Sequence, residues 1–174
     1  MNGNILPVEC RTERADDIAA IRDVVTAAFG RSDEADLVDA LRGEPDVWIP
    51  DLSVVATAAG GEIVGHALLT RCRVGDAPAL ALAPCSVDPG WQRRGVGIAA
   101  ITCALGLARG RAAENLVVVL GHPEYYPRFG FRPTSEAGIS ASFVVPDGAL
   151  MYLALDRSRP IPAGVITYPP AFGV

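Results

Sequence analysis

Residues 92–97, Gln-Arg-Arg-Gly-Val-Gly, combine two features of an anion site built on a protein backbone. Gly95 and Gly97 carry no side chain, so a ligand can approach the main chain closely. Arg93 and Arg94 add positive charges whose forked N–H groups suit phosphate. The alanine-rich stretch that follows is typical of a helix, and the first turn of a helix leaves backbone N–H groups unpaired. The spacing therefore predicts a site for a phosphate-bearing cofactor.

Residues 95–100 also fit G-x-G-x-x-A, the fingerprint of dinucleotide-binding folds. In those folds the fingerprint follows the first strand, and an acidic residue closes the second strand. Here three or four strand-like runs precede the glycines, and the next run ends at Leu120-Gly121-His122 without an acid. An oxidoreductase that binds a dinucleotide is kept as an alternative, but the context argues against it.

Composition limits the other chemistry that is available. The chain has 174 residues and is half hydrophobic, with a mean hydropathy of +0.28, which favours one folded domain over disorder. Its net charge of −5 argues against general nucleic-acid binding. Every basic residue is arginine, which excludes both a P-loop and a Schiff-base lysine. Acidic residues dominate 1–62, whereas arginines outnumber acids in 63–174, the half that contains the glycine loop.

The four cysteines, at positions 10, 72, 85 and 103, show no C-x-x-C spacing and lie in apolar runs. We expect reduced core thiols. With only two histidines, His66 and His122, a metal site is not expected. The sequence shows neither a signal peptide nor an apolar run of about 20 residues. These features predict a cytoplasmic protein that binds neither metal nor membrane, and they leave a homodimer open.

Periodicity and turn residues define the elements that must position the loop. The predicted strands are 5–11, 52–58, 62–74, 79–87 and 116–120, followed by a hairpin of 143–145 and 151–155. The predicted helices are one capped by Asp16 and ended by Gly30, one from Ser32 or Asp33 to Gly43, one from Gly95 to Arg109, and a short one from Pro123 to Phe129. The first of these helices is expected to face inward with Ile18, Ile21, Val25 and Phe29. Turn signals at Gly60-Gly61 and 75–78 make an antiparallel meander of the second to fourth strands.

Four further expectations concern packing. The helix after the glycine loop is apolar nearly all round, which predicts that it is buried. The strands on either side of this helix should pair in parallel through a right-handed crossover. Pro84 cannot donate a ladder hydrogen bond, so it implies an edge or a bulge in its strand. The proline-rich tail, 156–174, is predicted to pack as an extended strap.

Two motifs in this order of elements carry a family resemblance. Gln92-x-x-Gly95-x-Gly97 resembles the acetyl-CoA pyrophosphate loop of the GCN5-related N-acetyltransferase (GNAT) family, and Tyr126-x-x-x-Gly130-Phe131 resembles a later segment of that family. The resemblance spans roughly residues 5–155. The sequence around Tyr126 is similar to that of a bacterial subgroup often called YhbS-like. It implies an α/β (α+β) GNAT fold, with a mixed, mostly antiparallel sheet, one parallel pair, and helices on both faces. Residues 1–156 would form the acyltransferase domain, and 157–174 an extended segment packed on it.

The resemblance also implies a role for each site residue. Backbone N–H groups of Arg93, Arg94, Gly95, Val96 and Gly97 would hold the pyrophosphate of acetyl-CoA. Backbone atoms of Cys85 and Val87 would pair with the pantetheine arm, and Tyr126 falls at the general-acid position beside the CoA sulfur. The partner would be a small-molecule amine that takes up the acetyl group.

Several alternatives remain for these residues. Tyr126 is interpreted as functional and Tyr125 as packing, although both side chains suit packing. His122 can serve as a general base, since imidazole titrates near neutral pH, or it can merely cap the next helix. Some relatives keep a glutamate base in the strand before the loop, where this chain has only Cys85 and Ser86, so the base is undetermined. A non-catalytic module that binds acyl-CoA is the other alternative function.

Overall fold

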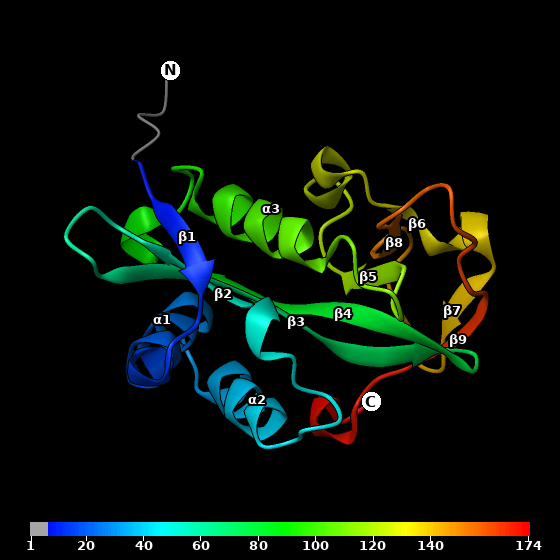
Figure 1. The fold of residues 1–174 in the computed structure, drawn as a ribbon, viewed down its shortest axis with the longest axis horizontal. Coiled ribbons are helices and arrows are strands. Elements are labelled where there is room, and N and C mark those ends of the chain that lie inside the picture. Colours follow the sequence, from blue (N-terminus) through cyan, green and yellow to red (C-terminus); the bar gives the residue numbers. More distant parts are fainter. Residues whose placement is uncertain (1–6) are drawn as a thin grey trace. The chain divides into compact units, whose positions relative to one another are not determined.

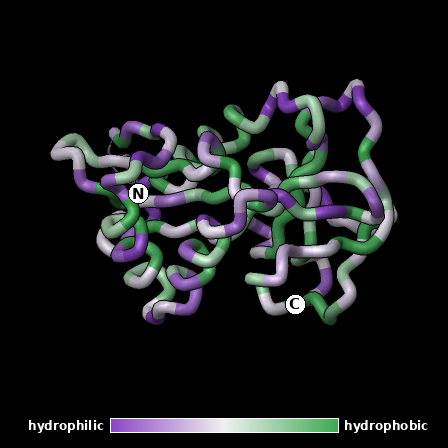
Figure 2. The backbone as a smooth tube through the Cα atoms, turned by 60° about the horizontal axis from the view of Figure 1, so that its bottom comes forward, coloured by the Kyte–Doolittle hydropathy of each residue, from purple (hydrophilic) through white to green (hydrophobic). Residues whose placement is uncertain are grey.

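The computed structural model describes residues 7–174, which form two compact units. The first unit contains residues up to 69 together with 84–107, and the second contains 70–83 and 108–174. The predicted first strand begins at residue 5, outside the described residues, and its described part is β1 (Glu9–Thr12). Hydrophobic and hydrophilic stretches alternate along the chain, which provides the apolar faces that each unit buries (Figure 2).

The first unit is a sheet with helices on both faces (Figure 1). Its strands are β1, β2 (Ser53–Thr57), the first half of β3 (Ile63–Val74) and the end of β4 (Ala77–Val87). β1 pairs with β2 and β2 with β3, both antiparallel. The helices α1 (Ile18–Phe29) and α2 (Asp33–Arg42) lie on one face, and α3 (Val96–Ala108) lies on the other.

Helix α1 ends where its sequence predicts, but its buried face is rotated. Gly30 adopts φ +69° and donates its N–H to the carbonyl of Thr26 at 2.8 Å, a glycine C-cap. Ile21 and Val25 are buried as expected, together with Val24. Ile18 and Phe29, which we expected to face inward, are 38% and 42% exposed. The sequence period identifies the helix, whereas packing against the sheet decides which of its residues are buried.

Helix α3 corrects a second expectation. Its buried stripe consists of small and apolar residues: Val96, Ala100, Ile101, Ala104, Leu105 and Ala108. The opposite side is not covered, because Ile98 and Leu107 are 41% and 44% exposed. An apolar helix is therefore not buried all round here, since this unit covers it from one side only.

The second unit also contains a sheet. Its strands are the second half of β3, the start of β4, β5 (Leu116–Leu120), β6 (Arg132–Pro133), β7 (Ile139–Ala141), β8 (Leu150–Ala154) and β9 (Gly164–Thr167). β4 and β5 pair in parallel at Leu80–Val117 and Ala81–Val118, which confirms the predicted crossover pairing. β8 lies antiparallel between β5 and β6. β7 and β9 add a second parallel pair that the sequence did not predict.

The predicted final hairpin is wrong in its first strand. Residues 143–145 are not a strand: Phe143 packs on Tyr168 with ring centroids 6.1 Å apart and Val145 packs on the core, while Val144 between them is 98% exposed. β8 takes β5 and β6 as partners instead. The predicted turn is present, because Ala149 donates its N–H to Pro146 at 3.1 Å and Gly148 has φ +72°.

The tail, residues 156–174, contains a strand, β9, where the sequence predicted only an extended segment. β9 pairs antiparallel with β3 at Arg73–Thr167 and parallel with β7 at Ser140–Val165. Asn115, buried just before β5, holds the start of the tail: its side-chain amide donates to the carbonyls of Asp156, Arg159 and Pro160 at 3.0–3.2 Å. Backbone pairing therefore fixes β9, although four residues flanked by prolines carry no strand signal. The division at residue 156 stays a prediction.

Candidate functional site

The loop between β4 and α3 has the backbone conformation of an anion-binding nest. Arg93 has φ +59°, and among the described residues it is the one non-glycine with positive φ. Gly95 follows with φ +85°. Left-handed residues in such a turn point successive N–H groups into one concavity, where they can bind an anion. A non-glycine held in this region costs about 1–2 kcal/mol, which is characteristic of a functional constraint.

Hydrogen bonds within the first unit hold this loop in place. The Asp88 carboxylate accepts from the N–H of Gly90 at 2.8 Å, and the Asp88 carbonyl accepts from Trp91 at 2.8 Å. The side chain of Gln92 donates to the carbonyl of Val87 at 3.4 Å. The Arg94 guanidinium carbon lies 5.9 Å from the centre of the Trp91 ring. Gln92, a residue of the predicted motif, thus ties the loop to the end of β4.

Helix α3, which follows the loop, packs against Gly65, a residue to which the sequence analysis gave no role. Gly95 accepts the first helical hydrogen bond of α3, from the N–H of Ala99 at 3.0 Å. A Cβ placed on Gly65 of β3 would lie 2.6 Å from Cγ1 of Val96, closer than real Cβ atoms approach. Gly65 therefore lets the first turn of α3 pack directly on the strand. This contact joins residues 31 positions apart, so only the folded chain shows it.

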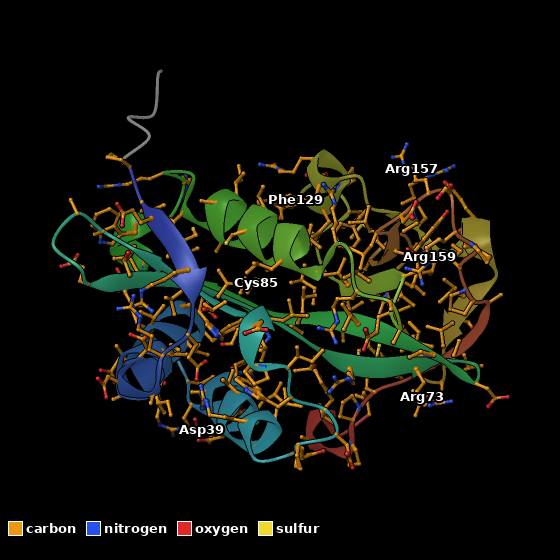
Figure 3. All side chains as sticks on the ribbon, viewed as in Figure 1. Asp39, Arg73, Cys85, Phe129, Arg157 and Arg159 are labelled. Carbon is orange, nitrogen blue, oxygen red and sulfur yellow. The ribbon has the colours of Figure 1, made fainter. Side chains whose placement is uncertain are left out.

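The end of β4 carries the two predicted pantetheine contacts. Cys85, labelled in Figure 3, and Val87 are both half-buried, and the neighbouring Pro84 is buried. The strand stays tied to β3 at its end, because Asp88 donates its N–H to Val64 at 2.9 Å. The registered pairs of β4 with β5 end at Ala81, six residues before β4 itself ends.

In the second unit, Tyr126 lies in an aromatic cluster after β5. Its ring meets Tyr125 edge-on with centroids 5.1 Å apart and Phe131 edge-on at 5.8 Å. It begins a 3₁₀ turn, Tyr126–Phe129, and not the helix from Pro123 that the sequence predicts. The N–H groups of Tyr125 and Tyr126 donate to the His122 carbonyl at 3.0 and 3.4 Å. The His122 backbone therefore begins this turn, while its side chain is exposed.

Tyr125 and Arg128 form a local pair beside this cluster. The Arg128 guanidinium carbon stands 4.3 Å from the centre of the Tyr125 ring, and its Nε donates to the Tyr125 carbonyl at 2.8 Å. These contacts support the interpretation of Tyr125 as a packing residue. The side chain of Arg128 is exposed.

A buried polar network in the first unit was missed by the sequence analysis. Ser53 donates its hydroxyl to Glu13, and its Oγ lies 2.8 Å from Nε2 of His66. Arg42 holds the same Glu13 carboxylate through Nε at 2.8 Å and stacks on Trp48 at 5.0 Å. Since the Ser53 proton points to Glu13, His66 donates from Nε2, and its Nδ1 is buried without a hydrogen-bond partner.

This network predicts acid sensitivity. Burial lowers the pKa of His66 to about 3, and the positive charge of Arg42 adds to this effect. Below about pH 6.5 the unfolded chain takes up a proton at this imidazole that the folded chain does not. The free energy of unfolding should thus decrease as the pH falls from about 6.5 towards 3, by up to about 1.4 kcal/mol per pH unit.

His66→Gln tests this expectation, since glutamine keeps a donor for Ser53 but cannot titrate. Urea denaturation at pH 7, 6 and 5 should show a slope against pH that is smaller by about one proton in the variant. An equal slope in both proteins would mean that another group carries the acid sensitivity.

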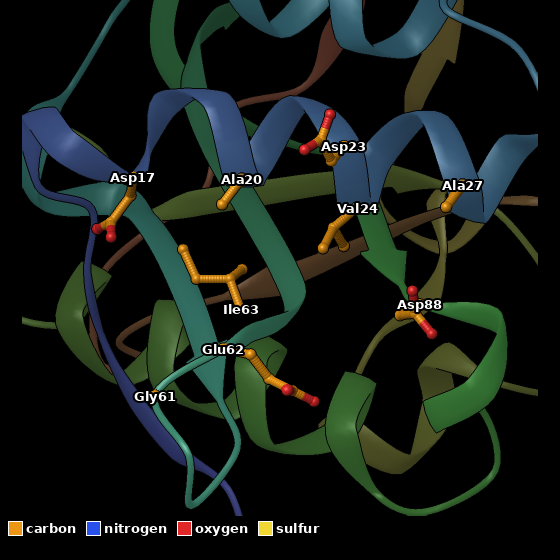
Figure 4. Close-up of a pocket in the computed structure, with 9 residues that line it drawn as sticks. All are labelled: Asp17, Ala20, Asp23, Val24, Ala27, Gly61, Glu62, Ile63 and Asp88. Carbon is orange, nitrogen blue, oxygen red and sulfur yellow. The ribbon is translucent and has the colours of Figure 1, made fainter.

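A separate concavity of about 470 Å³ lies between α1 and the start of β3 (Figure 4). Four carboxylates stand around it: those of Asp17, Asp23, Glu62 and Asp88. Arg11 binds Asp17 through two hydrogen bonds of 2.6 and 3.0 Å, and this pairing lowers the pKa of Asp17. The negative lining makes this concavity unsuitable for a phosphate group, which distinguishes it from the loop at 93–97.

The four cysteines are free thiols. Burial raises the pKa of Cys10 to about 11 and that of Cys72 to about 12, and it also raises the pKa of Cys103. Within residues 7–174, no group of three His, Cys, Asp or Glu side chains could hold a metal ion. No helix in this range is long and apolar enough to cross a membrane.

Comparison with known proteins places these features in a family context. The acetyltransferase (GNAT) family model matches residues 18–131, which include the glycine loop, Tyr126 and Phe131. An uncharacterized N-acetyltransferase of Escherichia coli K12, YjhQ, is 40% identical over 136 residues, covering 75% of this chain and 74% of that protein.

Two solved structures share the fold. A GNAT family acetyltransferase from Brucella melitensis, in complex with acetyl-CoA, superposes with a TM-score of 0.76 at 31% identity, covering 95% of this chain and 98% of that one. The N-acetyltransferase YhbS from Escherichia coli, in complex with CoA, superposes with a TM-score of 0.85 at 24% identity, covering 97% and 93%. At that identity the YhbS match supports the fold alone.

Proposed function

Because this chain belongs to the acetyltransferase (GNAT) family, we propose that it transfers an acetyl group from acetyl-CoA to the primary amine of a small molecule. The loop at the start of α3 carries the proposal, because Arg93 and Gly95 hold the left-handed conformations that an anion-binding nest requires. The acetyl-CoA bound by the relative from Brucella melitensis has a pyrophosphate that suits such a nest.

Each part of the cofactor has proposed contacts. The N–H groups of residues 93–97 bind the pyrophosphate, with the first turn of α3 contributing its partial positive charge. Cys85 and Val87 offer backbone atoms to the pantetheine arm as an added strand would. The pairing between β4 and β5 supports this assignment. Among the described residues, only Leu80 and Ala81 of β4 have paired residues in β5, and β4 continues beyond them to Val87.

Direct transfer assigns a task to three groups. The backbone N–H of Val87 donates to the oxyanion that develops at the thioester carbonyl. The Tyr126 hydroxyl donates to the departing sulfur. Full proton transfer from a phenol (pKa about 10) to a thiolate (about 8.5) would cost about 2 kcal/mol in water, so Tyr126 shares its proton without giving it up. The attacking amine must be neutral, which requires a base, directly or through water.

His122 is the proposed base, since its exposed imidazole stands four residues before Tyr126. Its carbonyl begins the turn that carries Tyr126, which fixes the backbone between the two residues. His122→Ala should flatten the rising limb of the pH–rate profile while acetyl-CoA affinity stays unchanged, because only the side chain is removed. If the limb keeps its shape, the base is another group, or the amine reaches the enzyme already neutral.

Thermal shift tests the function as a whole. A ligand at about 100 times its Kd stabilises the folded state by about 2.7 kcal/mol, so acetyl-CoA should raise the Tm and NADH should not. Stabilisation by NADH alone would overturn the proposal in favour of a dinucleotide-binding protein. Stabilisation by acetyl-CoA without CoA release across a panel of small amines would favour a non-catalytic binding module. We also propose a cytoplasmic location, which the free thiols support.

A further inference from the structure

The Tyr126 ring rests directly against the backbone of Gly121. A Cβ built on Gly121 would lie 2.3 Å from Cε2 of Tyr126, 3.0 Å from Cδ2 and 3.2 Å from Cζ. Real Cβ atoms are essentially never found closer than 3.0 Å to another heavy atom. All three atoms belong to the phenol ring, so any residue with a side chain at position 121 must displace that ring.

The Gly121 backbone itself would accept another residue. Gly121 is not among the glycines with positive φ, so an alanine here would suffer no left-handed strain. Its N–H donates to the carbonyl of Ala149 at 2.9 Å, which fixes the main chain at the end of β5. The requirement for glycine therefore arises from the ring of Tyr126 and not from the conformation of the chain.

The other sides of the ring leave it little freedom. Phe131, which is 2% exposed, meets it edge-on at 5.8 Å and Tyr125 meets it edge-on at 5.1 Å, while Phe129 lies 6.3 Å away. A ring pushed off Gly121 must move into this cluster or rotate out of it. Displacement of the whole ring carries the hydroxyl with it, because the hydroxyl stands on Cζ, one of the three atoms that face Gly121.

We infer that Gly121 is a positioning residue for acetyl transfer, because its bare α-carbon lets the Tyr126 hydroxyl take the orientation that the reaction uses. This inference rests on the proposed role of Tyr126. The turn Gly121-His122 would then contribute in two ways: through the missing side chain of Gly121 and through the proposed role of the His122 side chain.

Gly121→Ala is expected to lower kcat by about 10-fold to 100-fold, because a displacement of about 1 Å at a reacting group can cost that much. The KM for acetyl-CoA should change less than about twofold, since the proposed cofactor contacts are elsewhere. Gly60→Ala is the matched control: Gly60 has no atom within 4 Å of an added Cβ and no positive φ, so its kcat should equal that of the parent.

A double variant separates positioning from general damage. Tyr126→Phe keeps the ring and loses the hydroxyl, so adding Gly121→Ala to it should lower kcat by less than about twofold further. If Gly121→Ala lowers kcat equally in both backgrounds, its role is merely structural and the inference is overturned. If Tyr126→Phe alone leaves kcat unchanged, the proposed role of Tyr126 fails. If Tyr126→Phe lowers kcat and Gly121→Ala does not, the positioning role alone fails.

Stability provides a readout that does not need activity. If Gly121→Ala lowers the Tm, the further loss that it causes should be much smaller when it is added to Tyr126→Ala, because that change removes all three ring atoms that the new Cβ meets. An equal loss of Tm from Gly121→Ala in both backgrounds would show that the collision is with something other than the ring, and would overturn the inference.

Discussion

Gly95→Asp should weaken acetyl-CoA binding by at least about a hundredfold, since two independent effects act against it. The residue has φ +85°, so any side chain adds about 1–2 kcal/mol of strain and tends to flatten the nest. The new carboxylate would also stand among the N–H groups assigned to the pyrophosphate, where like charges repel. Titration calorimetry with acetyl-CoA, or the Tm shift that it produces, measures the loss.

Gly110 provides a matched control for this experiment. It has φ +87°, and an added Cβ would have no atom within 4 Å, so Gly110→Asp introduces the same charge and the same backbone strain after the far end of α3. Binding should remain close to that of the parent protein. Equal losses in the two variants would trace the effect to net charge or stability, and undiminished binding in Gly95→Asp would contradict the pyrophosphate assignment.

Tyr126→Phe should lower kcat by about 10-fold to 100-fold, because the departing thiolate loses its hydrogen-bond donor. Affinity for acetyl-CoA should stay nearly constant, since the phenyl ring keeps its contacts with Gly121, Tyr125 and Phe131. Steady-state kinetics with acetyl-CoA as the varied substrate separates the two effects.

Tyr125→Phe is the control for this substitution, as the neighbouring ring stacks under Arg128 and has only a packing role in our interpretation. Its kcat should remain within about twofold of the parent. Unchanged turnover in Tyr126→Phe would remove that hydroxyl from the chemistry, and equal losses in both variants would indicate that the aromatic cluster as a whole is sensitive.

Local signals predicted most of the elements that carry the site. The glycines, Gln92 and the alanine-rich helix placed the loop correctly, because turn chemistry and helix initiation depend on neighbouring residues. Strands β2 to β5 were predicted for a similar reason, since each is a strongly apolar run. β9 escaped prediction because its pairing partners, β3 and β7, are distant in the sequence.

The features that sequence reasoning missed are contacts between distant residues. From the sequence, Gly65 only weakens a predicted strand, because glycine has no side chain to pack; the structure shows that Val96 packs directly against it. His66 gives no sign of its link to Ser53 and Glu13, because the three lie on different segments. The exposed side of α3 was missed for a related reason: composition shows how apolar a helix is, and not how many neighbours cover it.

The raised pKa values of three thiols have a practical consequence for measuring turnover. Thiol reagents react with the thiolate, so a cysteine with a raised pKa stays protonated and reacts slowly near neutral pH. Cys10, Cys72 and Cys103 are all in this condition. These three thiols should therefore add little to the signal when a colorimetric thiol reagent records newly released CoA in a folded sample. The same reagent would reveal unfolding, because denaturation exposes these sulfurs together.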